Sequence, residues 1–229
     1  TLPAYNEEAN IRPMVLEVVD VFDGLVARGQ ISDYEVVVVN DGSKDKTGEV
    51  VDALSREHPK VRLVNHEVNK GYGAAVYTGF VSARKDLVFL TDSDKQFDVS
   101  EISKLLPLMD EADLVAGYRA PRRDPFKRRL FGMGWSTVVT VLFGYTVRDV
   151  DCAFKLFRRE IIESIDIASR GATFSAEFLV RAKRKGYRFR EVAVTHLPRV
   201  AGTQTGAKMH VILRAFRALI RFRWQLWQE

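Results

Sequence analysis

Two aspartates separated by one residue, Asp92 and Asp94, directly follow the apolar run Leu87–Leu90. Such a run is typical of a buried strand, so both carboxylates are expected at a strand end. Carboxylate oxygens at this spacing can face one divalent cation, and they favour Mg²⁺ or Mn²⁺. An isolated Asp-x-Asp is more often a solvated turn. Its place after a buried strand instead predicts a metal site that keeps open positions for substrate phosphates.

Two further polar segments have a composition suited to ligand binding. Asn40-Asp41-Gly42-Ser43 follows the run Val36–Val39, and Asp41 fits two roles equally: part of a turn before a helix, or a hydrogen-bond acceptor for a nucleobase or ribose. Lys70-Gly71-Tyr72-Gly73 offers a cation, Lys70, and a glycine-rich backbone before a helix, which suits a phosphate. Neither the GxGxxG nor the GxxxxGK[ST] spacing is present, which disfavours those nucleotide-binding classes.

Alternating strands and helices are predicted to position these segments. The β-branched run Val36–Val39 predicts a strand that is buried on both faces. The other predicted strands in the first half are Val61–Val64, Leu87–Leu90 and Leu114–Ala116, and the predicted helices are Ile11–Arg28 with Pro13 in its first turn, Thr47–His58, Gly73–Ala83 and Ser100–Met109. This order predicts an α/β fold with a mostly parallel sheet, whose ligands lie at the carboxyl ends of the strands.

The second half is less regular. A basic loop, Arg119–Arg129, precedes an uncharged stretch, Leu130–Val147, which glycines and flanking arginines mark as a buried or interfacial helix rather than a membrane span. We then predict a strand at Cys152–Phe157, a helix near Phe174–Lys185 and a strand near Phe189–His196.

The last segment, residues 207–229, predicts an amphipathic helix. Apolar residues recur every fourth position at Ile212, Phe216, Ile220 and Trp224, and arginines form a second stripe that includes Arg214, Arg217 and Arg221. This pattern favours contact with an anionic bilayer surface, and packing on the domain is the alternative.

Charge is distributed unevenly along the 229 residues. Residues 1–118 carry 12 basic and 21 acidic side chains, residues 119–180 carry 11 and 7, and residues 181–229 carry 12 and 2. An acidic front fits a cation-using site, and a basic tail fits an anionic partner. The single cysteine, Cys152, excludes an internal disulfide framework and is expected to be a small core residue. The chain starts at Thr1 as if most of a first strand were missing.

Eight ordered motifs resemble the family 2 glycosyltransferases with the GT-A fold, in their polyprenyl-phosphate branch, which includes dolichol-phosphate mannose synthase and bacterial glucosyl relatives. The motifs cover essentially the whole chain: LPAYNEE (2–8), VVVVNDGSKDKT (36–47), NKGYGAA (69–75), TDSDKQF (91–97), GYR (117–119), RDVDCAFKLFRR (148–159), SAEFLVRAKRKGYRFREVAV (175–194) and HLPR (196–199). The resemblance implies one GT-A domain over residues 1–206, with a nucleotide-sugar half (1–118) and an acceptor half (119–206), followed by the interface helix 207–229.

The resemblance also implies site residues. Pro3, Ala4, Tyr5, Glu7, Asp41, Lys70 and Arg199 would bind the donor, and Asp92, Asp94 and Gln96 would hold the metal. Arg119, Arg128 and Arg129 would bind the acceptor phosphate, and Asp92, Asp94, Arg119 and Asp149 would form the catalytic set, with Asp151 or Glu177 as alternatives to Asp149. Glu177 fits a structural role as well as a catalytic one, and His196 is expected to be a hydrogen-bonded strand-end residue rather than a metal ligand. The sequence departs from the family pattern at Gly132 or Met133, where a small polar residue is common, and in the longer loop after Arg199.

The implied activity is an inverting, metal-dependent transfer of mannose or glucose from a GDP-mannose- or UDP-glucose-class donor to a polyprenyl phosphate at the cytoplasmic face of a membrane. The chemistry agrees, because a phosphate monoester is already an anion near neutral pH and needs cations more than a general base. A saccharide hydroxyl acceptor, or nucleotidyl transfer, is the alternative. A basic nucleic-acid-binding module is disfavoured, because no recognition motif is present and the strand-end acids would have no role.

Overall fold

The computed structural model describes residues 1–121, 126–198 and 209–228, with the backbone alone for residues 126–129 and 209–214. Strands and helices alternate through the first half: β1 (Leu2–Ala4), α1 (Glu8–Ala27), β2 (Val36–Asp41), α2 (Thr47–Glu57), β3 (Val61–His66), α3 (Tyr72–Ser82) and β4 (Leu87–Thr91). The second half contains α4 (Ile102–Leu105), β5 (Leu114–Arg119), α5 (Phe126–Phe143), β6 (Phe154–Arg158), α6 (Glu160–Ser164), α7 (Phe174–Arg184), β7 (Phe189–Val194) and α8 (Met209–Gln228).

The strands form two hydrogen-bonded groups. One is the parallel group β1-β2-β3, and the other has the order β4-β6-β5-β7, in which β6 is antiparallel to both neighbours and β7 is parallel to β5. The Thr1 nitrogen donates to the Phe89 oxygen at 2.6 Å, and the Thr91 nitrogen donates to the Thr1 oxygen at 3.2 Å. This is the pattern of a parallel ladder, so a short seam between β1 and β4 joins the two groups.

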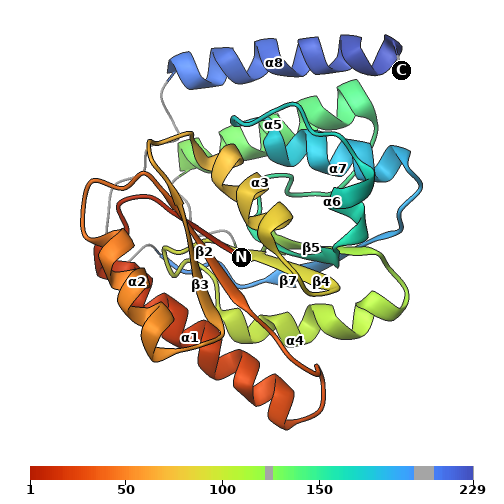
Figure 1. Cartoon of the computed structure of the whole chain (residues 1–229). Coiled ribbons are helices and arrows are strands. Elements are labelled where there is room, and N and C mark those ends of the chain that lie inside the picture. Colours follow the sequence, from red (N-terminus) through yellow and green to blue (C-terminus); the bar gives the residue numbers. More distant parts are fainter. Residues whose placement is uncertain (122–125, 199–208, 229) are drawn as a thin grey trace.

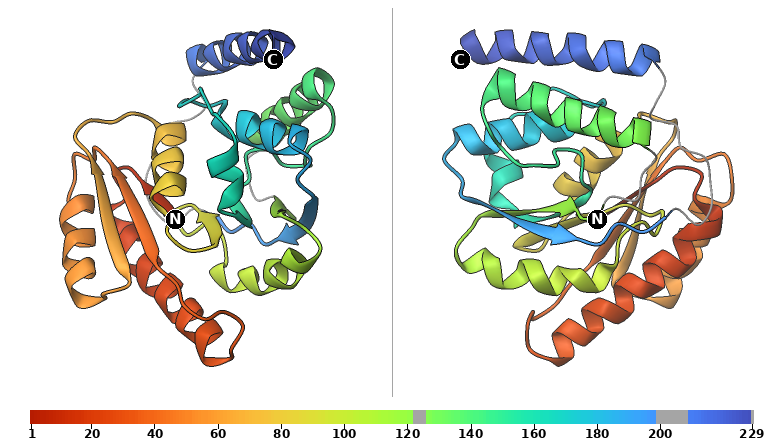
Figure 2. Two further views of the ribbon diagram at one scale, coloured as in Figure 1. Left: turned by 45° about the vertical axis from the view of Figure 1, so that its right-hand side comes forward. Right: turned by 180° about the vertical axis from the view of Figure 1, so that it is seen from behind.

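Helices cover both faces of the sheet, as the strand-helix alternation predicts. Figure 2 shows α1 and α4 on one face and α3, α6 and α7 on the other, with α5 and α8 as a further layer outside α7. All six residues of β2 are buried. Val36 and Val38 belong to the main core, whereas Val37 and Val39 pack with Ala75 on the opposite face, so the prediction of a strand buried on both faces is confirmed.

The centre of the core is aromatic. Phe80 of α3 packs edge-on against Phe157 of β6 with ring centroids 4.7 Å apart, and it also contacts Phe174 and Phe178 of α7. These rings fix α3 and α7 to the sheet. The start of α3 and the ends of β4 and β6 therefore keep a fixed relation, on which the site depends.

Several element boundaries differ from the predicted ones. Helix α1 begins at Glu8, three residues earlier than predicted, so Pro13 lies in its second turn rather than its first. The helix predicted over Ser100–Met109 is divided into two 3₁₀ segments around α4, and Pro107 accounts for the second because it has no backbone N–H to continue an α-helical ladder. The short helix α6 was not predicted.

Helices α5 and α8, the two helices predicted to lie at an interface, are both in the outer layer of the molecule. Figure 1 shows α8 running along the outside of the molecule above α5 and α7. Val139 of α5 is buried, whereas Leu130, Phe131, Met133 and Val141 are exposed, so α5 is a half-buried interfacial helix. Within the described residues, no helix is both long and apolar enough to cross a membrane.

Helix α8 carries two apolar stripes. Ala215, Leu219, Phe222 and Leu226 are buried, and Phe222 packs on Phe143 of α5. Phe216, Ile220, Trp224 and Trp227 are exposed, the last three at 65%, 64% and 79%. At 3.6 residues per turn, the exposed stripe lies about a quarter turn from the buried one. The helix thus packs on the domain and presents a second apolar stripe beside the contact.

Candidate active site

The Asp92-Ser93-Asp94 turn follows β4 at the seam between the two strand groups. The Ser93 hydroxyl donates to the Pro3 oxygen at 2.8 Å, which fixes the turn to the end of β1. The Asp94 carboxylate accepts from the Gln96 backbone nitrogen at 3.1 Å. Burial, and then the neighbouring charge of Asp94, raise the pKa of Asp92 to about 7, although the Tyr72 hydroxyl hydrogen-bonds to it and Arg119 and Lys155 lie near. Two carboxylates therefore lie close enough together for the charge of one to raise the pKa of the other.

These carboxylates fit a divalent cation that the protein holds only partly. In the described part of the chain, no three His, Cys, Asp or Glu side chains converge as a metal site. If Asp92 and Asp94 bind a cation, they supply two protein ligands and leave positions for phosphate and water, which is how Mg²⁺ and Mn²⁺ are commonly bound beside nucleotides. Burial and the charge of Asp94 both disfavour the ionised form of Asp92, and a divalent cation would offset the repulsion between the two carboxylates.

Arg119 and Asp149 form a buried, bidentate ion pair beside this turn. The Arg119 Nε and Nη2 atoms each lie 2.7 Å from an Asp149 carboxylate oxygen, and both side chains are almost fully buried. Arg119 ends β5, and Asp149 precedes β6, so adjacent strands bring the two residues together. The pair fixes the plane of the guanidinium, as a site built for a phosphate requires.

Lys155 is a site residue that sequence reasoning missed. It is 2% exposed in the middle of β6, and its ammonium donates to the backbone oxygens of Val150, at 3.1 Å, and Cys152. Burial lowers its pKa, and the charges of Asp149 and Asp151 oppose that shift. Lys155 therefore holds the turn that carries Asp149 and Asp151, and its ammonium lies near Asp92. A lone lysine in the apolar run Ala153–Phe157 was the available signal.

Asp151 lies two residues after Asp149 on the turn that Lys155 holds. Withdrawal from water, and then the charge of Asp149, raise its pKa to about 6. Of the two candidates for the acceptor-side carboxylate on this turn, Asp149 is the one that forms an ion pair with Arg119. Cys152, the next residue, is fully buried, which confirms the prediction of a small core residue.

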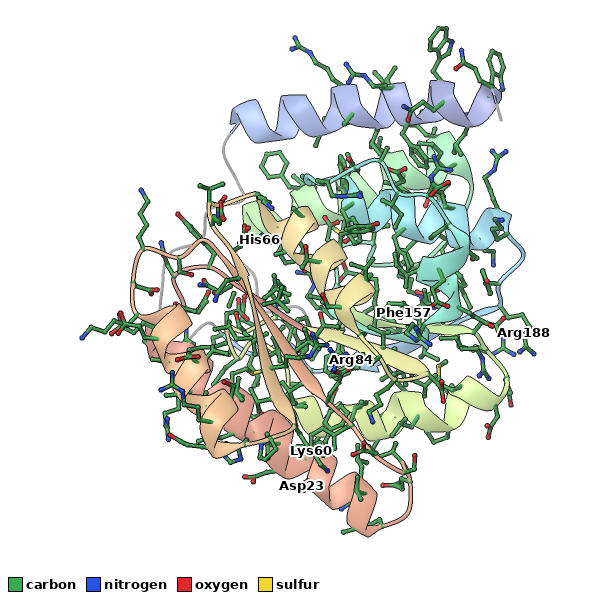
Figure 3. All side chains as sticks on the ribbon, viewed as in Figure 1. Asp23, Lys60, His66, Arg84, Phe157 and Arg188 are labelled. Atoms are coloured by element: carbon green, nitrogen blue, oxygen red, sulfur yellow. The ribbon has the colours of Figure 1, made fainter. Side chains whose placement is uncertain are left out.

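Asp41, at the end of β2, organises the glycine-rich loop. Its carboxylate accepts hydrogen bonds from the backbone nitrogens of Lys70, at 2.9 Å, and Gly71, at 2.8 Å, and from His66 Nδ1 at 2.7 Å. The other His66 ring nitrogen lies 2.9 Å from the Thr78 hydroxyl of α3. Figure 3 shows His66 at the end of β3 next to α3. Of the two roles considered for Asp41, the contacts show a loop anchor, and a ligand contact stays a prediction.

Two glycines let this loop region pack closely. A Cβ on Gly42 would lie 2.4 Å from the Val68 carbonyl carbon, and the residue has φ of +64°. A Cβ on Gly73 would lie 2.3 Å from the Gly171 oxygen. No side chain fits at either place, so the loop before α3 packs against the Asp41 turn, and the start of α3 packs against the loop before α7.

The segment after β1 is hydrogen-bonded to the segment after β2. The Glu7 nitrogen donates to the Thr47 hydroxyl at 2.9 Å, and the buried Glu7 carboxylate accepts from the Asn10 amide at 2.7 Å. Pro3 and Ala4 are buried within β1, and Tyr5 is half-buried at its end. The structure thus places all four predicted donor residues of this segment along one strand and the turn that follows it.

Gln96 and His196 connect the metal-site turn to the segment after β7. The Gln96 side-chain amide donates to the Leu197 oxygen at 3.3 Å, and the Leu197 nitrogen donates to the Gln96 oxygen at 2.8 Å. The buried His196 ring packs on Phe97 with centroids 5.7 Å apart. His196 lies at a strand end as expected, in contact with the core.

Glu177 stabilises the loop before α7. Its carboxylate accepts from the backbone nitrogens of Ala168, at 3.0 Å, and Ser169, at 2.8 Å, and from Arg181 Nε at 2.9 Å. Because its carboxylate already accepts three hydrogen bonds, the structural role of Glu177 is favoured over the catalytic one.

Three other predicted site residues lie outside the described part of the chain. Nothing of Arg199 is described, and the side chains of Arg128 and Arg129 at the start of α5 are not described.

The chain is similar to known proteins in sequence and in structure. A dolichyl-phosphate β-glucosyltransferase from Trichomonas vaginalis is 34% identical over 172 residues, covering 69% of this chain and 51% of the relative. A polyprenol monophosphomannose synthase from Mycolicibacterium smegmatis is 30% identical over 214 residues, covering 88% of this chain and 77% of the relative. The chain thus spans about half of the first relative's length and about three quarters of the second's.

A solved structure supports the fold. Glucosyl-3-phosphoglycerate synthase from Mycobacterium tuberculosis, in complex with Mn²⁺, uridine diphosphate and phosphoglyceric acid, superposes with a TM-score of 0.71 at 20% sequence identity, covering 97% of this chain and 76% of that one. This likeness shows the GT-A fold, as the motifs predicted. The model of the glycosyl transferase family 2 matches residues 1–166, and this chain belongs to that family.

Proposed function

We propose that this chain catalyses inverting transfer of a hexose, mannose or glucose, from a nucleotide-diphosphate sugar to a polyprenyl phosphate. The observation that carries the proposal is the Arg119–Asp149 ion pair beside the Asp92–Asp94 turn. It puts a fixed guanidinium next to a carboxylate pair suited to a cation, where a donor diphosphate and an acceptor phosphate need opposite charge. The names of the two relatives support the same acceptor class.

The donor would lie across the carboxyl ends of β1, β2 and β4. The turns after β1 and β2, which the Glu7 and Asp41 contacts hold in place, would surround the nucleoside. The loop anchored on Asp41 presents Lys70, whose cationic side chain is exposed, toward a phosphate. A divalent ion, Mg²⁺ or Mn²⁺, held by Asp92 and Asp94 with Gln96 adjacent, would stabilise the negative charge that develops on the leaving diphosphate.

The transfer is a single displacement. An acceptor phosphate oxygen attacks the anomeric carbon, a new carbon–oxygen bond forms, and the bond to the nucleoside diphosphate breaks on the opposite face, which inverts the configuration. No proton must be removed from a phosphate dianion. Arg119 would hold that phosphate, with Arg128, Arg129 and Arg199 as further predicted phosphate contacts.

The same ion pair argues against the saccharide-acceptor alternative. A sugar hydroxyl needs a general base, and the Asp149 carboxylate already accepts two hydrogen bonds from a guanidinium. Such a carboxylate is a weak base, because proton transfer to it would break the ion pair. A phosphate acceptor needs no such base.

The membrane part of the proposal comes from α8. Its exposed Ile220, Trp224 and Trp227, with Arg217 and Arg221 also exposed, suit an anionic bilayer surface at the cytoplasmic face, where a polyprenyl phosphate acceptor would be reached. The half-exposed apolar helix α5 lies beneath it and adds to the same layer.

A partition assay tests the transfer. The chain is incubated with labelled GDP-mannose or UDP-glucose, Mn²⁺ and a polyprenyl phosphate, and the products are extracted into organic solvent. Label in the organic phase is expected, and it should disappear with excess chelator and with Asp94→Asn, whose thermal unfolding should stay close to wild type. Label on an added saccharide, or full turnover in chelator, would contradict the proposal.

A further inference from the structure

A cavity of about 270 Å³ lies where α5, α7 and α8 meet, away from the residues assigned to sugar transfer. Its apolar walls come from Leu142 and Phe143 of α5, Val180 of α7 and Leu226 of α8. Two arginines, Arg184 at the end of α7 and Arg223 of α8, also line it. Arg184 is exposed and Arg223 is half-buried, so both guanidinium groups stand in contact with solvent beside the apolar walls.

The two arginines have no acidic partner in the described part of the chain. Neither forms an ion pair there, whereas the nearby Arg181 is paired with Glu177. Lys183 and Lys185 flank Arg184 along the chain, so the charge around the cavity is positive. Arginine matches the oxygens of a phosphate with its planar fork of donors. The cavity therefore suits an anion that has an apolar portion.

Arg223 also connects the cavity to the exposed apolar stripe of α8. Its guanidinium lies over the Trp227 ring, 6.0 Å from the centroid, and Trp227 is among the most exposed apolar side chains of the molecule. A ligand phosphate bound at Arg223 would therefore lie at the level of a tryptophan that suits the boundary between lipid headgroups and acyl chains.

We propose that this cavity binds the headgroup phosphate of an anionic membrane phospholipid, through Arg184 and Arg223, as a site separate from the one that binds the acceptor. This inference rests on the membrane part of the proposed function. It goes further by assigning selectivity for a lipid phosphate to two residues, where the proposed function assigns only a general attraction of a basic helix to negative charge.

The test compares two double variants of equal charge. In Arg184→Gln/Arg223→Gln the cavity loses both guanidinium groups, and in the control Arg217→Gln/Arg221→Gln the exposed face of α8 loses two. Flotation is measured with phosphatidylcholine vesicles that contain 20% phosphatidylglycerol, or oleate at the same surface charge. We expect the cavity variant to lose about tenfold in affinity for phosphatidylglycerol vesicles and to lose its preference over oleate, and the control to lose about threefold with the preference intact.

Three results would overturn the inference or separate it from its premise. Equal losses in both double variants would mean that only general electrostatics operates. Release of the wild-type protein from vesicles by millimolar glycerol 3-phosphate would mean that the cavity binds a soluble phosphate ester. If the wild-type protein binds no anionic vesicle at all, the membrane part of the proposed function fails, and the inference fails with it.

A third double variant, Arg184→Lys/Arg223→Lys, keeps the charge of both side chains but lacks the planar guanidinium. It should retain vesicle binding but lose the preference for phosphatidylglycerol.

Discussion

At the scale of single residues, most side chains of the candidate site already form hydrogen bonds or ion pairs with other groups of the protein. Asp149 is paired with Arg119, Asp41 accepts three hydrogen bonds, and Lys155 is bonded to two backbone oxygens. Each of these contacts fixes an orientation before substrate arrives. Asp92 is different, because burial and the charge of Asp94 raise its pKa, and a cation bound there would offset both effects.

Metal binding should therefore depend on pH. With its pKa raised to about 7 by burial and by Asp94, Asp92 keeps its proton in the metal-free protein below that pH, and a divalent ion must displace it. Apparent Mn²⁺ affinity should rise about tenfold per pH unit from pH 5 to pH 7 and level off above pH 8. Calorimetry at pH 6 in buffers of different ionisation enthalpy should show about one proton released. A flat profile in wild type would show that Asp92 is not a ligand.

Asp41→Ala tests the loop anchor. The sequence alone predicts that this change weakens donor binding far more than it lowers stability. The three hydrogen bonds to the carboxylate now predict both effects, because three donors lose their partner, and the free energy of unfolding should fall by about 2–3 kcal/mol. Affinity for the nucleoside diphosphate should fall at least about tenfold in calorimetry. Lost stability with unchanged affinity would leave Asp41 a structural residue only.

At the scale of elements, α8 combines the two roles that its sequence left as alternatives. The spacing of every fourth residue identified Phe216, Ile220 and Trp224, which the structure leaves exposed. The stripe that packs on the domain contains Leu219, Phe222 and Leu226, which lie outside that every-fourth-residue pattern. Helical periodicity identifies apolar stripes, but it does not say which of two adjacent stripes meets the core.

This division changes the test of membrane binding. The sequence predicts that removing 207–229 prevents sedimentation with anionic liposomes, but that deletion also uncovers core around Phe222 and Leu226. The double variant Trp224→Ser/Trp227→Ser is a more specific test of membrane binding than the deletion, since both side chains are exposed. It should reduce liposome binding at least about tenfold with little change in thermal unfolding. The control Leu219→Ala should lower the free energy of unfolding by about 2–4 kcal/mol and leave liposome binding largely intact. The opposite pattern would assign the membrane contact to another surface.

Prediction from sequence succeeded where a local pattern decided the outcome. A β-branched run predicted β2, an apolar run predicted β4, and the strand ends located the aspartates at one edge of the sheet. It failed for Lys155 and His66, because their roles depend on backbone oxygens and side chains brought close by strands distant in the chain. It also gave no sign that β6 is antiparallel, since an apolar run carries no direction.

At the scale of the whole molecule, the proposed donor site extends across the seam between the two strand groups. The segments proposed to bind the nucleoside follow β1 and β2, and the turn proposed to hold the metal follows β4. A bound donor would contact both groups, so it should stabilise the molecule as a unit.

A thermal-shift panel tests this expectation. GDP or UDP with Mn²⁺ should raise the melting temperature, and a hundredfold excess over Kd corresponds to about 2.7 kcal/mol of added stability. Either component alone should raise it much less, because the metal joins the diphosphate to Asp92 and Asp94. The nucleotide that gives the larger shift identifies the base. Equal shifts with and without metal would contradict a metal-bridged donor.

The seam itself has a kinetic consequence. In the described part of the chain, β4 is held against β1 by the two hydrogen bonds around Thr1 and by the Ser93–Pro3 hydrogen bond, whereas β2 and β3 share a six-residue ladder. The Thr91 amide, which donates across the seam, should therefore exchange its hydrogen with solvent sooner than the amides inside β2. Donor and metal together would slow that exchange. The exchange rate of the Thr91 amide therefore reports how often the two strand groups separate at the seam.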